Sequence, residues 1–234
     1  MPDGYSRSPR LLKGALVELG EPFLGPIPNV VVFQYNPASF SREMTPWAPP
    51  TEDDAAGGEE PRTQPYDPGE TFSLDLELDA TDALEEPGSH PVAAVSGVAD
   101  RIAAMEMLLY PRREEGGVGQ FLSALGGGSA AAVPECTVPV VLFVWGPGRI
   151  LPVRLTAFTV EEQAFSPTLY PVRAKVTVGM KVLTPAAFQR PGRELTQPES
   201  LAVAAYNFTR GQKELLARAN LANSVESILG MLPF

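Results

Sequence analysis

The stretch VRAKVTVGMKVL, residues 172–183, alternates between apolar and other side chains along nearly its whole length. A period of two places successive side chains on opposite faces of a β-strand, so that one face can be buried while the other stays in water. The apolar face holds Val172, Ala174, Val176, Val178, Met180 and Val182, and the other face holds Arg173, Lys175, Thr177 and Lys181. We therefore predict a strand that covers a core on one side and presents a basic surface on the other.

A second stretch, FSLDLELD at residues 72–79, has the same period but carries the opposite charge. Its apolar face holds a phenylalanine and three leucines, and its polar face includes Asp75, Glu77 and Asp79. Oppositely charged strand faces pair naturally, either across a sheet or between subunits. We expect this acidic face to meet the basic face of residues 172–183.

Other segments add strand signals. Residues 10–19 and 30–35 are rich in aliphatic and aromatic residues and are separated by a proline and glycine break, which predicts a hairpin. Residues 138–145 and 149–158 flank the tight turn Gly146-Pro147-Gly148. Six or more strands indicate a mainly β fold, either a two-sheet sandwich or a barrel.

Two regions carry helical signals. Apolar residues recur at spacings of three and four from His90 to Tyr110, which predicts the only long helix, lying over an open face or edge of the sheet. Thr196 to Glu199 fits a capping box, and the residues after it predict a tail of three short helical pieces. We divide the chain into a β domain, residues 1–190, and a helical tail, residues 191–234. Residues 46–69 are rich in proline, glycine and acid and predict a long loop within the first domain.

Composition limits the chemistry and the location. One cysteine, Cys136, and one histidine, His90, are too few for a disulfide framework or a zinc site. The N-terminus lacks the apolar region of a signal peptide, and the longest apolar run, residues 138–145, is too short to span a bilayer. We expect cytoplasmic assembly without membrane insertion. The net charge of −10 comes from residues 51–90, which hold thirteen acids and one arginine, so the acidity is local and the overall charge says little about partners. We expect no nucleic-acid partner.

The acidic face of residues 72–79 is the best candidate for catalysis, because paired carboxylates can hydrolyse glycosides or hold calcium. No EF-hand spacing accompanies it, and the basic strand face offers it structural partners, so a structural role is favoured. A carboxylate enzyme that acts on polysaccharide is kept as an alternative. The glycine runs near Gly116 and Gly126 lack the spacing of a phosphate-binding loop. We predict no catalytic residue, no metal and no cofactor.

The stretch FQYNPASF at residues 33–40 ends a strand at Asn36-Pro37, because a residue before proline avoids the helical region. This exit, followed by PVVLFVWG at residues 139–146 and by the strands of residues 153–183, resembles the tube-protein family of contractile injection systems. The resemblance covers Lys13 to Leu183. It implies a tail-tube-like, two-sheet barrel with one flanking helix, followed here by a short helical C-terminal appendage, and assembly as hexameric rings.

Versions with this Asn-Pro signature resemble the adaptor, or tube initiator, that lies between the spike and the first tube ring at the baseplate of a phage tail-like particle. The resemblance implies a homo-hexamer whose partners are the spike, the inner tube protein and baseplate wedge or sheath-side proteins. Residues 199–220 are also similar to the helical part of a LysM module, so glycan binding is a further alternative. The predicted assembly contacts are Tyr35, Asn36, Pro37, Phe40, Asp75, Glu77, Asp79, Arg173, Lys175, Lys181, Leu201, Phe208, Leu215 and Phe234.

Overall fold

The structure is a computed structural model that describes residues 12–20, 29–47, 66–111, 138–189 and 192–229. Most of the predicted loop at 46–69, together with Cys136 and the assembly residue Phe234, lies outside these ranges. Nothing in the described residues tests the division of the chain at residue 190, which stays a prediction.

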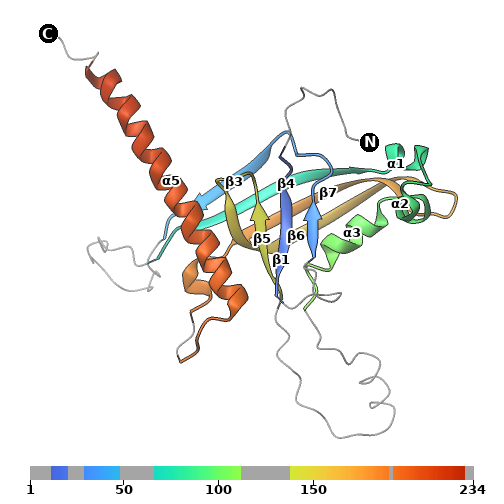
Figure 1. Ribbon diagram of the computed structural model, residues 1–234, viewed down its shortest axis with the longest axis horizontal. Coiled ribbons are helices and arrows are strands. Elements are labelled where there is room, and N and C mark those ends of the chain that lie inside the picture. Colours follow the sequence, from blue (N-terminus) through green and yellow to red (C-terminus); the bar gives the residue numbers. More distant parts are fainter. Residues whose placement is uncertain (1–11, 21–28, 48–65, 112–137, 190–191, 230–234) are drawn as a thin grey trace, which may run out of the picture.

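Seven strands form one antiparallel sheet (Figure 1). The strands are β1 (Ala15–Leu19), β2 (Val30–Val32), β3 (Phe40–Thr45), β4 (Gly69–Asp79), β5 (Val140–Val144), β6 (Ile150–Phe165) and β7 (Pro171–Val182). Their order across the sheet is β2-β1-β5-β6-β7-β4-β3. The prediction of a mainly β fold is confirmed, and so is the N-terminal hairpin, because β1 pairs with β2.

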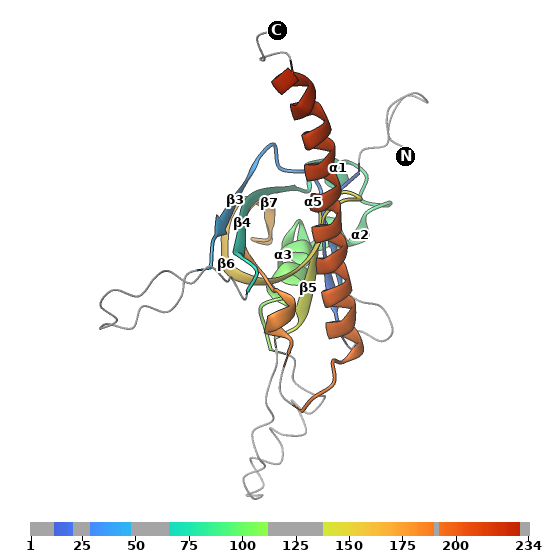
Figure 2. The ribbon, with the colours of Figure 1, turned by 90° about the vertical axis from the view of Figure 1, so that its left-hand side faces the viewer.

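The prediction of a closed, two-sheet barrel is wrong. The structure has one sheet, and its first and last strands, β2 and β3, do not pair with each other in the described residues. Figure 2 shows how the single sheet curls around α3 (Ala99–Glu106). On the concave side, the ring of Phe40 on β3 lies 6.3 Å from that of Phe143 and 5.0 Å from that of Trp145, between centroids. Alternation along a strand shows which face is buried, but it does not show whether a second sheet or the same sheet covers that face.

The concave face of the sheet forms the core, as the alternation predicts. In the register of β4 against β7, buried side chains stand opposite each other, including Leu76 with Val176 and Leu74 with Val178. Helix α3 adds Ile102 to this cluster. The convex face carries the polar and charged residues of the same strands and stays exposed to solvent.

The single helix predicted at residues 90–110 is instead two short helices, α2 (Pro91–Ser96) and α3, and a further short helix, α1 (Thr81–Glu85), precedes them. The break falls at Gly97, whose φ is +59°, and Val98, whose N–H donates to the carbonyl of Pro171 over 2.9 Å. The chain turns here because it comes into backbone contact with the start of β7. Spacing of apolar residues alone does not reveal this tertiary contact.

The C-terminal tail is also different from its prediction. Instead of three short pieces, it contains the longest helix of the described chain, α5 (Gln197–Leu229, 33 residues), preceded by the 3-10 helix η1 (Pro185–Ala187). The capping box is confirmed, since Glu199 accepts from the Thr196 N–H over 2.8 Å and its own N–H points at the Thr196 hydroxyl over 3.5 Å. Gly211 lowers helix stability by only about 1 kcal/mol and therefore does not end the helix.

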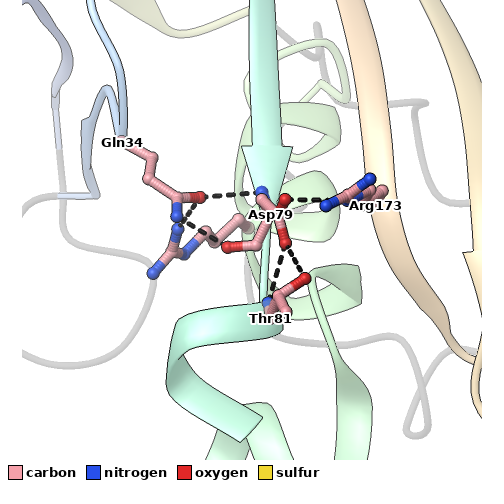
Figure 3. Close-up of polar contacts among 5 residues, drawn as sticks. Gln34, Asp79, Thr81 and Arg173 are labelled. Carbon is pink, nitrogen blue, oxygen red and sulfur yellow. Dashed lines mark hydrogen bonds and ion pairs between the residues drawn. The ribbon is translucent and has the colours of Figure 1, made fainter. Parts of the chain in front are cut away.

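Residues 33–39 cross from β2 to β3, that is, from one edge of the sheet to the other. The Gln34 amide donates to the Asp79 carbonyl over 2.6 Å and accepts from the Asp79 N–H over 3.0 Å, at the end of β4 (Figure 3). The Asn36 amide accepts from Gly14 N–H over 2.8 Å and donates to the Leu12 carbonyl over 2.7 Å, just before β1. Two side-chain amides therefore fasten this crossing segment to strands on both sides of the opening.

We expect Gly97→Ala to lower the free energy of unfolding by at least about 2 kcal/mol, because φ is positive and the new Cβ would lie 2.1 Å from the Pro171 carbonyl oxygen. Gly211→Ala is the matched control, since nothing lies within 4 Å of its added Cβ, and it should raise stability by up to about 1 kcal/mol. Urea denaturation measures both. A Gly97→Ala variant as stable as the parent would contradict the close approach.

Candidate assembly surfaces

The acidic face of β4 meets the basic face of β7 within one chain. The Lys175 Nζ lies 2.9 Å from an oxygen of Asp75, and the Arg173 Nε lies 2.8 Å from an oxygen of Asp79. A hydrogen bond from the Thr177 hydroxyl, and then one from Lys175, holds the pKa of Asp75 below its usual value. Of the two alternatives open at the sequence level, pairing across the sheet is the one that the structure shows.

Burial would raise the pKa of Asp79, but hydrogen bonds from Thr81 and Arg173 outweigh it and lower that pKa (Figure 3). In turn, the hydrogen bond to Asp75 raises the pKa of Lys175. Exposed pairs of this kind contribute little to stability, because water screens the attraction between the charges. Glu77 and Lys181 have no ion pair in the described part of the chain, so these two predicted residues remain available for other contacts.

Three strands extend beyond the rest of the sheet. Of the residues of β6, only 150–153 pair with β5, and of the residues of β4, only 69–74 pair with β3. The remaining parts of these strands therefore form a three-stranded extension, here called the tongue. It consists of residues 154–165 of β6, residues 75–79 of β4 and the part of β7 that lies between them. In the described residues, the outer edge of β6 in the tongue has no backbone partner, whereas the β4 edge is capped at Asp79 by Gln34.

The predicted residues of the crossing segment divide into internal and exposed ones. Phe40 is half-buried in an aromatic cluster, and the guanidinium of Arg149 lies 5.4 Å above its ring. Asn36 is exposed, but its side-chain amide is already hydrogen-bonded to the backbone just before β1. Tyr35, with 46% of its surface exposed, offers an apolar group to a partner, and Pro37 is half-buried.

Helix α5 is anchored to the sheet by its first half. The hydroxyl of Thr209, which is 2% exposed, accepts from the Ile150 N–H over 2.9 Å and donates to the Ile150 carbonyl over 2.7 Å. One side chain thus serves both backbone groups at the start of β6, as a neighbouring strand would. Ala202 lies seven residues earlier, about two helical turns away on the same side of the helix, and is fully buried.

Two acids at the start of β4 hold the same helix. Asp67 accepts from the Tyr206 hydroxyl over 3.1 Å and from Arg210 over 3.0 Å. Glu70 is only 5% exposed, and its two carboxylate oxygens lie 2.8 Å from the Lys213 Nζ and 2.7 Å from the Arg42 Nε. The contact with Arg42 is an ion pair and not a well-aligned hydrogen bond. A buried carboxylate needs such cations, because removing either leaves a poorly compensated charge.

These groups surround a cavity of about 200 Å³, also lined by Met44, Pro68 and Leu151. Burial first, and then the bond to Asp67, raises the pKa of Tyr206 to about 12, so its hydroxyl stays a donor at neutral pH. Sequence reasoning missed this anchor because Glu70 and Lys213 are far apart in the chain. One signal was present: Glu70 falls on the apolar face of its strand, two residues before Phe72, which marks a buried acid.

Beyond Lys213, α5 stands clear of the sheet (Figure 1). We call its Glu214–Leu229 part the arm. The predicted contacts Leu201, Phe208 and Leu215 recur every seven residues along α5 and are all about half exposed. Leu216 and Leu221 on the arm are exposed as well. The helix therefore has one side that packs on the sheet and another apolar side without a partner in the described residues.

Other kinds of site find little support. Among the described residues, no three His, Cys, Asp or Glu side chains gather in a way that could hold a metal. None of the described helices combines the length and apolar character needed to cross a bilayer. The three candidate catalytic carboxylates, Asp75, Glu77 and Asp79, lie on the convex face of β4 and are not among the residues that line the cavity.

Comparison with protein families matches residues 23–189 to the family described as contractile injection system tube protein. The match covers strands β2 to β7 and η1, begins after β1 and stops before α5. Comparison with curated proteins finds no match.

We expect Thr209→Val to weaken the docking of α5 by about 1–3 kcal/mol, because both backbone groups of Ile150 lose their partner in a buried place. Thr209→Ser keeps the hydroxyl and should stay within about 1 kcal/mol of the parent. Hydrogen exchange of residues 197–213 measures the docking equilibrium. Equal protection in the valine and serine variants would show that packing, and not the hydroxyl, holds the helix.

Proposed function

The chain belongs to the contractile injection system tube protein family, and from this we propose that it is a structural ring component of such a system's baseplate. In this role it links the spike to the inner tube and to the surrounding baseplate proteins. The family membership supports a structural role. The position at the baseplate rests on the Asn36-Pro37 signature and on the arm.

The observation that carries the ring is the open sheet with its extended tongue. Unpaired strand edges are templates for another chain, and a long edge that stays free is a liability for an isolated molecule. The β6 edge of one subunit and the β3 edge of the next differ in sequence and position, so their pairing would be heterologous. A heterologous contact that closes gives a ring, and the resemblance indicates six subunits.

The two faces of the sheet fit such a ring. The concave face is filled by the subunit's own core, whereas the convex face is polar, and two ion pairs on it form within the chain. A face of this kind can border a water-filled space without further cover. Assembly would therefore use the strand edges and the two ends of each subunit.

The arm supports contact with proteins outside the ring. Its direction is set by Thr209, Asp67 and Glu70, and its exposed leucines lack an internal partner in the described chain. We propose that it docks on a baseplate wedge or sheath-side protein. The two alternatives have less support: α5 is continuous and no described strand pair accompanies it as a LysM module requires, and two of the three candidate catalytic carboxylates are held by cations.

The ring is tested by mass photometry and electron microscopy of the purified chain, alone and with co-expressed baseplate proteins. We expect closed particles of six copies, each contact burying well over about 1,000 Å², as specific interfaces do. Particles that contain a single copy of this chain under every condition would refute the ring.

The arm is tested by ending the chain after Lys213, which keeps every anchoring contact to Asp67, Glu70 and Ile150. The truncated protein should melt at nearly the same temperature as the parent and still form rings, yet recover fewer wedge or sheath-side proteins in a pull-down. A full-length chain with Leu215, Leu216 and Leu221 changed to serine is the matched control and should behave like the truncation. Undiminished recovery by both variants would show that the arm is not the contact.

A further inference from the structure

Where the arm leaves the sheet, cations outnumber the acids beside them. The buried carboxylate of Glu70 is shared by Lys213 at 2.8 Å and Arg42 at 2.7 Å. Arg149, whose guanidinium lies above the ring of Phe40, is a third cation near this carboxylate, because the charges of Arg42 and Glu70 both act on its pKa. In the described residues Arg149 has no ion pair. One carboxylate therefore serves three positive charges.

Helix α5 adds to this excess. Arg210 pairs with Asp67 at 3.0 Å and with Glu214 at 3.5 Å, so both acids are already occupied. Arg218 lies one helical turn after Glu214, is exposed and has no ion pair in the described chain. We call five residues the root cations: Arg42, Arg149, Arg210, Lys213 and Arg218. Five positive charges against the three negative ones of Asp67, Glu70 and Glu214 leave a local charge of +2, on a chain whose net charge is −10.

The excess is reachable from water and is not reduced by other acids on the same strand. Glu43 follows Arg42, but successive side chains of a strand point to opposite faces. About a third of the side-chain surface of Arg42 is exposed, and slightly more of that of Lys213. Burial, and then the charge of Arg42, lower the pKa of Arg149, so Glu70 does not offset the cationic surroundings. An external carboxylate would relieve this repulsion.

Apolar groups border the root cations on two sides. The cavity beside Glu70 is walled in part by Met44, Pro68 and Leu151, and Met44 is exposed. On the arm, Leu215 and Leu216 are exposed directly after Lys213 and Glu214. Cations with apolar neighbours of this kind fit a protein surface that combines an acid with apolar side chains, because a polyanion that offers only charge would leave the apolar groups uncovered.

We propose that the root cations bind an acidic residue of the surrounding baseplate protein on which the arm docks. This inference rests on the proposed function and specifies the chemistry of the partner: a carboxylate placed next to the apolar side chains that cover Leu215 and Leu216. The occupant is argued from charge complementarity and from continuity, because the arm begins directly after Lys213, one of the root cations. The docking of the arm is therefore sensitive to salt as well as to apolar contact.

The test reverses the two root cations that have no ion pair in the described residues. In full-length chains co-expressed with baseplate proteins, Arg149→Glu with Arg218→Glu should lower recovery of the arm's partner in a pull-down at least about tenfold at low salt. Recovery by the parent should fall as salt rises. Arg154→Glu with Lys181→Glu is the matched control and should change nothing, because it makes the same change of charge at two exposed cations of the convex face. Circular dichroism and melting confirm that both double variants are folded.

A second measurement identifies the bound group. Arg149→Lys and Arg218→Lys keep the positive charge and each supplies an amine. A carbodiimide joins such an amine to a carboxylate at ion-pair distance as an amide, with loss of water. Mass spectrometry of the crosslinked complex should find the lysine joined to an Asp or Glu of the partner.

Three results would overturn the inference. They are equal recovery by the reversed and control variants, no crosslink, or crosslinks only to residues 51–60 of the chain itself, which hold five acids. If recovery is lost on ending the chain after Lys213 but not on charge reversal, the inference fails and the proposed arm contact stands. If even the parent recovers no baseplate protein, the proposed arm contact fails and the inference fails with it.

Discussion

The fold depends on seven residues that bridge the opening of the sheet. Between β2 and β3 the chain passes from one edge to the other, and its backbone groups cannot join a regular ladder there. The segment is held by its side chains instead: the Gln34 amide bonds to both backbone groups of Asp79 at the end of β4, and the Asn36 amide bonds to the backbone of Gly14 and Leu12 just before β1. A residue before proline avoids the helical region, so Pro37 favours an extended conformation at Asn36. With both edges tied, the sheet stays curled.

The curl determines the rest of the core. It brings Phe40 on the last strand against Phe143 and Trp145 on a strand near the other edge, so one sheet covers its own apolar face. Helix α3 fills the remaining space with Ile102 and Met105. Because three strands are longer than the others, the curled part cannot include their ends, and the tongue projects with a free β6 edge. The opening of the sheet and the free edge of the tongue therefore both follow from the curl of the sheet and the unequal strand lengths.

The sequence carries local patterns well and distant contacts poorly. Alternation was sufficient to predict β4, β7 and the faces that they bury, and the capping box gave the start of α5. The break at Gly97 depends on the carbonyl of Pro171, and the anchor of α5 pairs Glu70 with Lys213, 143 positions away. No window of sequence contains both members of such a pair. The opposite charges of β4 and β7 can be read from the sequence and predict that the two strands pair. Whether they pair within one chain or between two subunits could not be predicted, because that depends on the order of the strands in the sheet.

The anchor of α5 consists of buried polar groups that fix the orientation of the helix. Replacing a buried ion pair by apolar residues is often neutral for stability, so Glu70 with its two cations is better explained by specificity. An apolar contact would let the helix slide or rotate on the sheet, whereas the hydroxyl of Thr209 and the acids Asp67 and Glu70 accept only one register. The arm leaves the subunit in a fixed direction as a result. In a ring of identical subunits, every arm would then point the same way relative to the axis, which is the geometry that a surrounding shell of partners requires.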